Sequence, residues 1–182
     1  LGAGGCASQG KHNSEFAQAA QAKLNGMKSG IEAQQAEQEF LAGDLDKAIK
    51  TVDSSIAMSP KIAAAHLLRA RILMEQGDLG KAAQALDRAA ELATDDVQTE
   101  YFQGVLRERT GERERALKHY QRAMALDGTN PQHMVAAAEV LVELGRPDEA
   151  RQMLDQQVGP ALSNNAAIKH VRGRLALLAR DW

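Results

Sequence analysis

Cysteine is almost absent from this sequence. Cys6 is the single thiol among 182 residues, so the chain can form no internal disulfide and no cage of cysteine ligands around a metal. The five histidines do not fill that gap, because none is followed by a histidine or cysteine three or four residues later. Such a spacing would place two metal ligands on one face of a helix. We therefore expect neither a metal nor another cofactor.

Other absences limit the function. No run of about 20 apolar residues is present, which is the length needed to span a membrane as a helix. The formal net charge is -2, whereas a nucleic-acid-binding surface needs a basic excess. There is no glycine-rich phosphate loop, nucleophile elbow or defined pair of catalytic carboxylates. We therefore expect no enzymatic activity, no nucleic-acid partner and no small-molecule substrate.

One short pattern occurs four times at an interval of 34 residues. Its first copy, residues 43–48, reads Gly-Asp-Leu-Asp-Lys-Ala. The copies begin at Gly43, Gly77, Gly111 and Gly145, and they end at Ala48, Ala82, Ala116 and Ala150. A fixed step of this size is typical of stacked repeats, in which each unit packs on its neighbours along one axis.

Two further columns keep the same register. A small residue stands seven positions before each glycine, and a larger apolar residue stands nine positions after it. The small residues are Ala36, Ala70, Gly104 and Ala138, and the larger ones are Val52, Leu86, Tyr120 and Leu154. Each unit is therefore predicted to be two helices of about 12 to 14 residues around a glycine turn, with small residues where the helices cross.

Together these columns resemble the tetratricopeptide repeat (TPR) family. The resemblance implies an all-α fold, a right-handed α-solenoid of antiparallel helix pairs that forms a TPR-like superhelix. The four units implied are residues 29–62, 63–96, 97–130 and 131–164. The sequence departs from the family in lacking its Trp/Leu pair in the first helix and in keeping its closing proline only as Pro60.

The first eight residues resemble the end of a bacterial lipoprotein signal peptide. In that pattern small residues precede a cysteine that receives the lipid, although Ala3 stands here where the pattern has leucine. The resemblance implies that Cys6 is the lipid attachment site and that residues 1–13 are a lipobox-like segment and flexible tether. It also implies a membrane-anchored lipoprotein on the periplasmic or cell-surface side. The alternative is an ordinary exposed cysteine in a cytoplasmic protein.

Residues 14–28 are predicted to form a helix with Ser14 as its N-cap. Apolar residues recur on one face of this helix at Phe16, Ala20, Leu24, Met27 and Ile31. We expect this face to cap the open end of the first repeat, and the alternative is a dimerisation helix. Glycines at 26 and 30 weaken a helix by about 1 kcal/mol each relative to alanine. The helix is therefore expected to break near the first glycine, or to continue to Leu41 with a bend.

Residues 165–182 are predicted to begin a fifth unit. Gly173 occupies the small column, seven positions before Arg180-Asp181-Trp182, which resembles the start of a second helix. The alternative is a C-terminal capping helix. Leu177 and Leu178 are too apolar for the polar outer face of such a cap, so we expect the chain to be a piece of a longer protein.

In the TPR family the first helices of successive units line a concave groove that holds a peptide. The resemblance places these residues in the groove: Leu67, Arg71, Met74, Tyr101, Val105, Arg109, Val135 and Glu139. One branch of the family grips a C-terminal carboxylate with Lys and Asn in two of the groove columns, and this sequence lacks both there. We therefore expect an apolar partner segment rather than a carboxylate clamp. The alternative for each apolar position is a place in the core.

These observations favour a non-enzymatic, membrane-tethered scaffold for protein–protein interaction, which binds a partner segment in its groove. One alternative is a docking or regulatory arm of a larger enzyme, or of a secretion or pilus assembly protein. Another is a scaffold that polymerises through its open ends.

Overall fold

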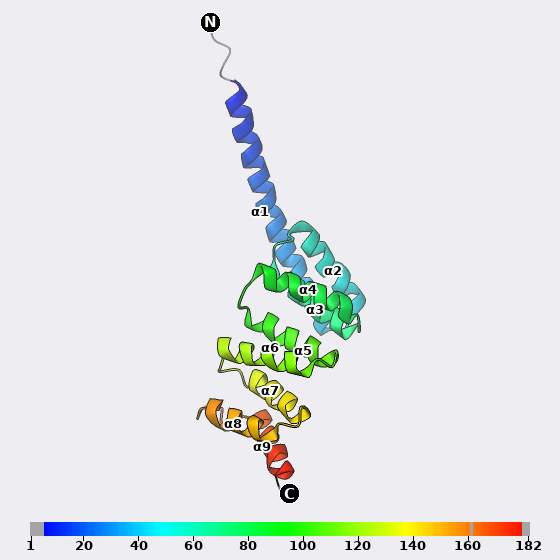
Figure 1. The fold of residues 1–182 in the computed structure, drawn as a ribbon. Coiled ribbons are helices and arrows are strands. Elements are labelled where there is room, and N and C mark those ends of the chain that lie inside the picture. The colour runs from blue at the N-terminus through cyan, green and yellow to red at the C-terminus, as the bar shows by residue number, and fades with distance from the viewer. Residues whose placement is uncertain (1–5, 161, 180–182) are drawn as a thin grey trace.

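The computed structural model describes residues 6–160 and 162–179, and within these ranges it consists of nine α-helices and no β-strand. The helices are α1 (Cys6–Leu41), α2 (Leu45–Met58), α3 (Ala63–Glu75), α4 (Leu79–Leu92), α5 (Val97–Arg109), α6 (Arg113–Leu126), α7 (Pro131–Glu143), α8 (Pro147–Gln157) and α9 (Ala166–Leu178). Consecutive helices from α1 to α8 form four pairs, and the pairs stack along one axis (Figure 1). The predicted all-α solenoid is confirmed.

A glycine turn joins the two helices of every pair, as predicted. The φ angles are 83° at Gly43, 81° at Gly77, 79° at Gly111 and 74° at Gly145, in the left-handed region that glycine enters without cost to a Cβ. In the first turn the amide of Gly43 donates to the carbonyl oxygen of Phe40 at 3.0 Å, and the amide of Asp44 donates to that of Glu39 at 2.9 Å. The other three turns repeat this pair of bonds, which satisfies carbonyl groups left unpaired where a helix ends.

The small and large columns are buried in all four pairs. The crossing alanines are fully buried, namely Ala48, Ala82, Ala116 and Ala150. In the third unit the two columns are adjusted to each other, because a Cβ at Gly104 would lie 2.5 Å from Cε1 of Tyr120. Glycine thus replaces alanine in the one unit where tyrosine replaces valine or leucine.

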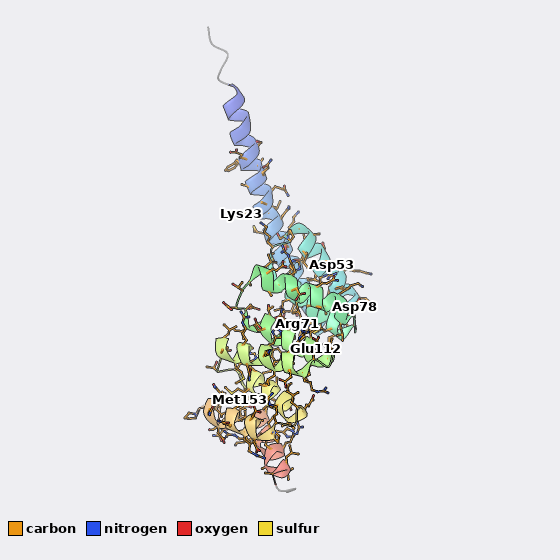
Figure 2. The ribbon with its side chains drawn as sticks, in the orientation of Figure 1. Lys23, Asp53, Arg71, Asp78, Glu112 and Met153 are labelled. Carbon is orange, nitrogen blue, oxygen red and sulfur yellow. The ribbon has the colours of Figure 1, made fainter. Side chains whose placement is uncertain are left out.

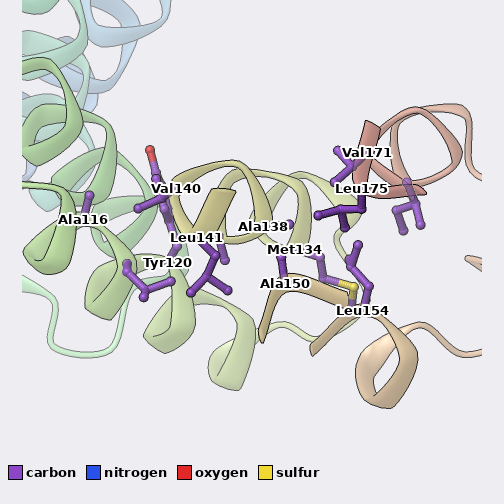
Figure 3. Packing of buried hydrophobic residues seen from close by; sticks show 13 residues of the cluster. Ala116, Tyr120, Met134, Ala138, Val140, Leu141, Ala150, Leu154, Val171 and Leu175 are labelled. Atoms are coloured by element: carbon purple, nitrogen blue, oxygen red, sulfur yellow. The ribbon is translucent and has the colours of Figure 1, made fainter. Parts of the chain in front are cut away.

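Three buried clusters follow one another along the stack. Ile49 packs against the first and the second cluster, and Val105 packs against the second and the third. In the third cluster, side chains of α6, α7, α8 and α9 pack together around Met134, Leu141 and Leu154 (Figure 3). The core is therefore a series of contacts between neighbouring units, as expected of a solenoid.

The first helix begins earlier than predicted. It starts at Cys6 rather than at Ser14, and it follows the second of the two predicted courses by continuing through Gly26 and Gly30 to Leu41, which makes one helix of 36 residues. The predicted flexible tether is therefore wrong for residues 6–13, while residues 1–5 lie outside the described part of the chain. The alanine-rich sequence around the predicted start favours the helix, and packing on α2 offsets the cost of the two glycines.

The face of α1 that was expected to cap the first repeat does not do so. Phe16, Met27 and Ile31 are 79%, 63% and 65% exposed. The face that packs is instead the one with Ser29 and Ala36, both fully buried. The hydroxyls of Ser29 and Ser55 each donate to the other residue's carbonyl oxygen at 2.9 Å, which joins α1 to α2.

Helix α9 packs on α7 and α8 through Ile168, Val171 and Leu175, which are buried. Asn165 caps its start by accepting hydrogen bonds from two backbone amides of the first turn. Gly173 is exposed, with no atom within 4 Å of the place its Cβ would occupy. The predicted turn at Arg180-Asp181-Trp182 lies outside the described residues.

Candidate functional site

A cavity of about 530 Å³ opens where the first helices of successive units come together. Helices α1, α3, α5 and α7 contribute to its wall, as does the connection between α6 and α7. The lining residues are Glu37, Arg71, Val97, Gln98, Tyr101, Phe102, Asp127, Asn130, Gln132 and His133. A volume of this size is within the usual range for binding sites of small ligands or peptide side chains.

Arg71 lines the cavity and contacts two aromatic rings. Its guanidinium carbon lies 5.0 Å from the ring centroid of Phe40 and 5.2 Å from that of Phe102. A nitrogen of the same guanidinium lies 3.6 Å from a carboxylate oxygen of Glu37. These contacts join α1, α3 and α5, and Figure 2 shows Arg71 near the middle of the stack. Two cation–π contacts and the nearby carboxylate hold this charge in position.

Tyr101 lines the cavity and contacts several of its other residues. Its ring packs edge-on to that of Phe102 at 5.3 Å between centroids, and its centroid lies 5.3 Å from that of His133. Its hydroxyl accepts a hydrogen bond of 2.9 Å from the side-chain amide of Gln132. Burial raises the pKa of Tyr101, so the hydroxyl stays protonated at neutral pH.

His133 is the most unusual side chain in the cavity. It is 3% exposed, and neither ring nitrogen has a hydrogen-bond partner. Burial lowers the pKa of His133, an effect that the nearby charge of Asp127 partly opposes. The ring is therefore neutral at pH 7, with one nitrogen that can donate a hydrogen bond and one that can accept.

The structure brings two of the eight predicted groove residues to this cavity, Arg71 and Tyr101. Leu67 and Met74 are 7% and 3% exposed, so they belong to the core instead. Val105 also packs against the core.

The other predicted positions contact neighbouring helices. Val135 packs against the cluster around α7. Arg109 donates to the carbonyl oxygen of Met74 at 2.7 Å and to the Glu75 carboxylate at 2.8 Å, so it ties α5 to α3. Glu139 accepts a bond of 3.3 Å from Arg174 of α9.

Sequence reasoning missed Phe102, His133 and the polar residues at the start of α7. One signal was present, because the chain has only three phenylalanines and two tyrosines, and three of these five residues lie at this site. Phe40, Tyr101 and Phe102 come from two different units, and nothing in the repeat columns brings them together.

The described residues include no group of three or more His, Cys, Asp or Glu side chains that could hold a metal ion. In the same part of the chain, no helix combines the length and the apolar character that crossing a membrane requires.

Two tetratricopeptide repeat family models match the sequence, over residues 34–97 and 109–175. The chain belongs to the tetratricopeptide repeat family. Together the matched segments cover most of the repeats. A comparison with curated protein sequences found no match.

Solved TPR structures share the fold at low sequence identity. PilF of Pseudomonas aeruginosa superposes with a TM-score of 0.77 at 14% identity, over 86% of this chain and 71% of that one. A thermophilic TPR protein of Thermus thermophilus, TTC0263, gives 0.66 at 21% identity, over 85% and 83%. The first TPR of Spaghetti (RPAP3), solved with the HSP90 peptide SRMEEVD, gives 0.63 at 18% identity, over 66% and 95%. At these identities the likeness establishes the fold alone.

Proposed function

We propose that this TPR protein is a non-enzymatic scaffold that binds an extended segment of a partner protein in the cavity between α3, α5 and α7. The observation that carries the proposal is His133, buried in the cavity wall with both ring nitrogens unpartnered. A buried polar group without a partner costs about 1 to 3 kcal/mol, and a segment that displaces the side chains covering the ring and supplies the missing bond recovers that cost. Peptide backbone offers both a donor and an acceptor at short spacing.

The charges of the cavity favour a segment without strong charge of its own. The cavity lining carries one positive charge, on Arg71, and two negative charges, on Glu37 and Asp127, while the imidazole of His133 is neutral, so the net charge is only -1. The rings of Tyr101 and Phe102 offer a surface for an apolar side chain of the segment. The HSP90 peptide bound to the Spaghetti TPR supports a peptide as the class of ligand.

The same proposal includes the membrane tether. The segment Leu1 to Ser8 resembles a lipoprotein signal end, so a lipid on Cys6 would hold the protein on the periplasmic or cell-surface side of a membrane. In the native cell, Cys6→Ser in the full precursor should release the protein from the membrane fraction. Unchanged membrane association that survives high salt would contradict the lipid anchor.

A photo-crosslinking residue at Gln98 tests the binding site. Gln98 is exposed and lines the cavity, whereas Gln84 is also exposed but lies on α4, outside the cavity. Crosslinking in the native cell should trap one partner from position 98, through a segment identified by mass spectrometry, and should not trap it from position 84. Equal trapping from both positions, or none from position 98, would overturn the proposal.

A further inference from the structure

The outer part of α1 projects beyond the stack of repeats (Figure 1). We call residues 6–25 the arm, and at about 1.5 Å per residue it is about 30 Å long. Every residue of the arm from Ser14 to Leu24 is exposed. An isolated helix of this length is only marginally stable in water, because it gains little from packing. A surface that covers one side of the arm would stabilise it.

One side of α1 carries large apolar side chains that are exposed to solvent. These are Phe16, Leu24, Met27 and Ile31, which are 79%, 44%, 63% and 65% exposed, and we call them the apolar stripe. Successive residues of a helix turn by about 100°, which places the stripe on the opposite side of α1 from Ser29 and Ala36. Since Ser29 and Ala36 are buried against the repeats, the stripe faces away from them.

Positive charges border the apolar stripe on both of its edges. By the same helical geometry, Lys23 lies about 60° to one side of the stripe's centre and Lys28 about 80° to the other side. Both side chains are exposed, and Lys23 is labelled on α1 in Figure 2. Between residues 14 and 31 the only acidic residue is Glu15, which falls on the far side of the helix from the stripe.

We propose that the apolar stripe lies on the surface of a lipid bilayer that carries anionic headgroups. The four apolar side chains would enter the boundary between headgroups and acyl chains, and the two lysines would reach the phosphates on either side. The repeats pack on the opposite face of α1, so they would stand in water with the groove helices unobstructed by lipid. This surface is separate from the cavity around His133 and does not depend on what the cavity binds.

The charge pattern disfavours a second copy of the chain as the occupant. In a parallel pair of α1 helices, Lys23 of one copy would face Lys28 of the other. In an antiparallel pair centred on Leu24, the two copies of Lys23 would lie near each other. Like charges at these flanking positions oppose pairing, whereas both lysines complement an anionic lipid surface.

Vesicle co-sedimentation of the full, unlipidated chain under reducing conditions tests the proposal. The protein should bind phosphatidylcholine vesicles that contain phosphatidylglycerol, and it should bind pure phosphatidylcholine vesicles much less. Lys23→Gln and Lys28→Gln should each lower the partition coefficient about fivefold. Lys50→Gln, an equal change of charge at an exposed position on α2, should leave it unchanged.

The stripe itself is tested by Leu24→Ser with Ile31→Ser, which should abolish vesicle binding. Leu177→Ser, at a side chain 64% exposed on α9, serves as the matched control and should bind as the parent does. Circular dichroism establishes that each variant is folded. Equal binding to both vesicle types, or to neither, would overturn the proposal. So would a dimer in sedimentation that the two serine substitutions dissociate, because a second copy would then cover the stripe.

Discussion

Replacing Gly104 with alanine should destabilise the protein, although alanine is the better helix former. An alanine Cβ would lie 2.5 Å, 2.6 Å and 3.0 Å from three ring carbons of Tyr120. The ring cannot move freely, because it is 1% exposed and its hydroxyl donates to Glu108 at 2.8 Å. Overpacking of this kind costs about 1 to 3 kcal/mol. The higher helix propensity of alanine offsets about 1 kcal/mol of this cost, so we expect the free energy of unfolding to fall by up to about 2 kcal/mol.

A double-mutant cycle separates the clash from other effects. Tyr120→Leu alone should be destabilising, because it leaves a cavity beside Gly104. The pair Gly104→Ala and Tyr120→Leu restores the combination found in the second unit, where Ala70 stands in the small column and Leu86 in the large one. Urea unfolding followed by circular dichroism should therefore give a double variant more stable than the sum of the single effects predicts, by at least about 1 kcal/mol. Additive effects, or a Gly104→Ala variant more stable than the parent, would refute the packing argument.

Three further predictions concern the turns, the crossing and the buried histidine. Gly77→Ala should lower the free energy of unfolding by about 1 to 2 kcal/mol, because the φ angle of Gly77 is 81°. Gly80→Ala, in helical backbone, should raise it by up to about 1 kcal/mol. The reverse order of melting temperatures would contradict the turn geometry. Ala82→Leu should overpack the helix crossing and lower the free energy of unfolding by about 1 to 3 kcal/mol. Ala22→Leu on the exposed arm should leave the melting temperature unchanged. Burial lowers the pKa of His133 below its unfolded value, so the parent's stability relative to His133→Phe should fall as pH drops below about 6.5. A difference independent of pH would show that His133 is not buried as a neutral ring.

The repeats could be predicted because their determinants are local. A glycine with positive φ and an alanine five residues later depend only on the turn and on the helix crossing beside it. The register of Gly43, Gly77, Gly111 and Gly145 therefore predicted the turns and the buried columns together.

The cavity could not be predicted in this way, because it depends on how one unit is rotated against the next. Arg71 meets Phe40 and Phe102 only through that rotation, and the same rotation buries Leu67 and Met74 in the core.

The first helix illustrates a different limit. Periodicity correctly grouped Phe16, Leu24, Met27 and Ile31 on one face, but it could not say which face of α1 would meet the repeats. The fully buried residues of the packing face are small, Ser29 and Ala36, and they carry little weight in an apolar pattern; the one large apolar residue that packs there is Phe40. Hydroxyl bonds between Ser29 and Ser55 and close approach of the helices decide the orientation instead.

The central claim is that His133 and Tyr101 line the site where the partner segment binds. The most direct test is to measure by calorimetry how tightly the partner segment crosslinked at position 98 binds to three proteins. These are the parent, the His133→Phe variant and the surface control Arg88→Gln. Phenylalanine keeps the buried ring and removes both nitrogens, so a matching melting temperature would show that the fold is intact. The account predicts about tenfold weaker binding by His133→Phe, and parental affinity for the control. Equal affinity in all three proteins would contradict it.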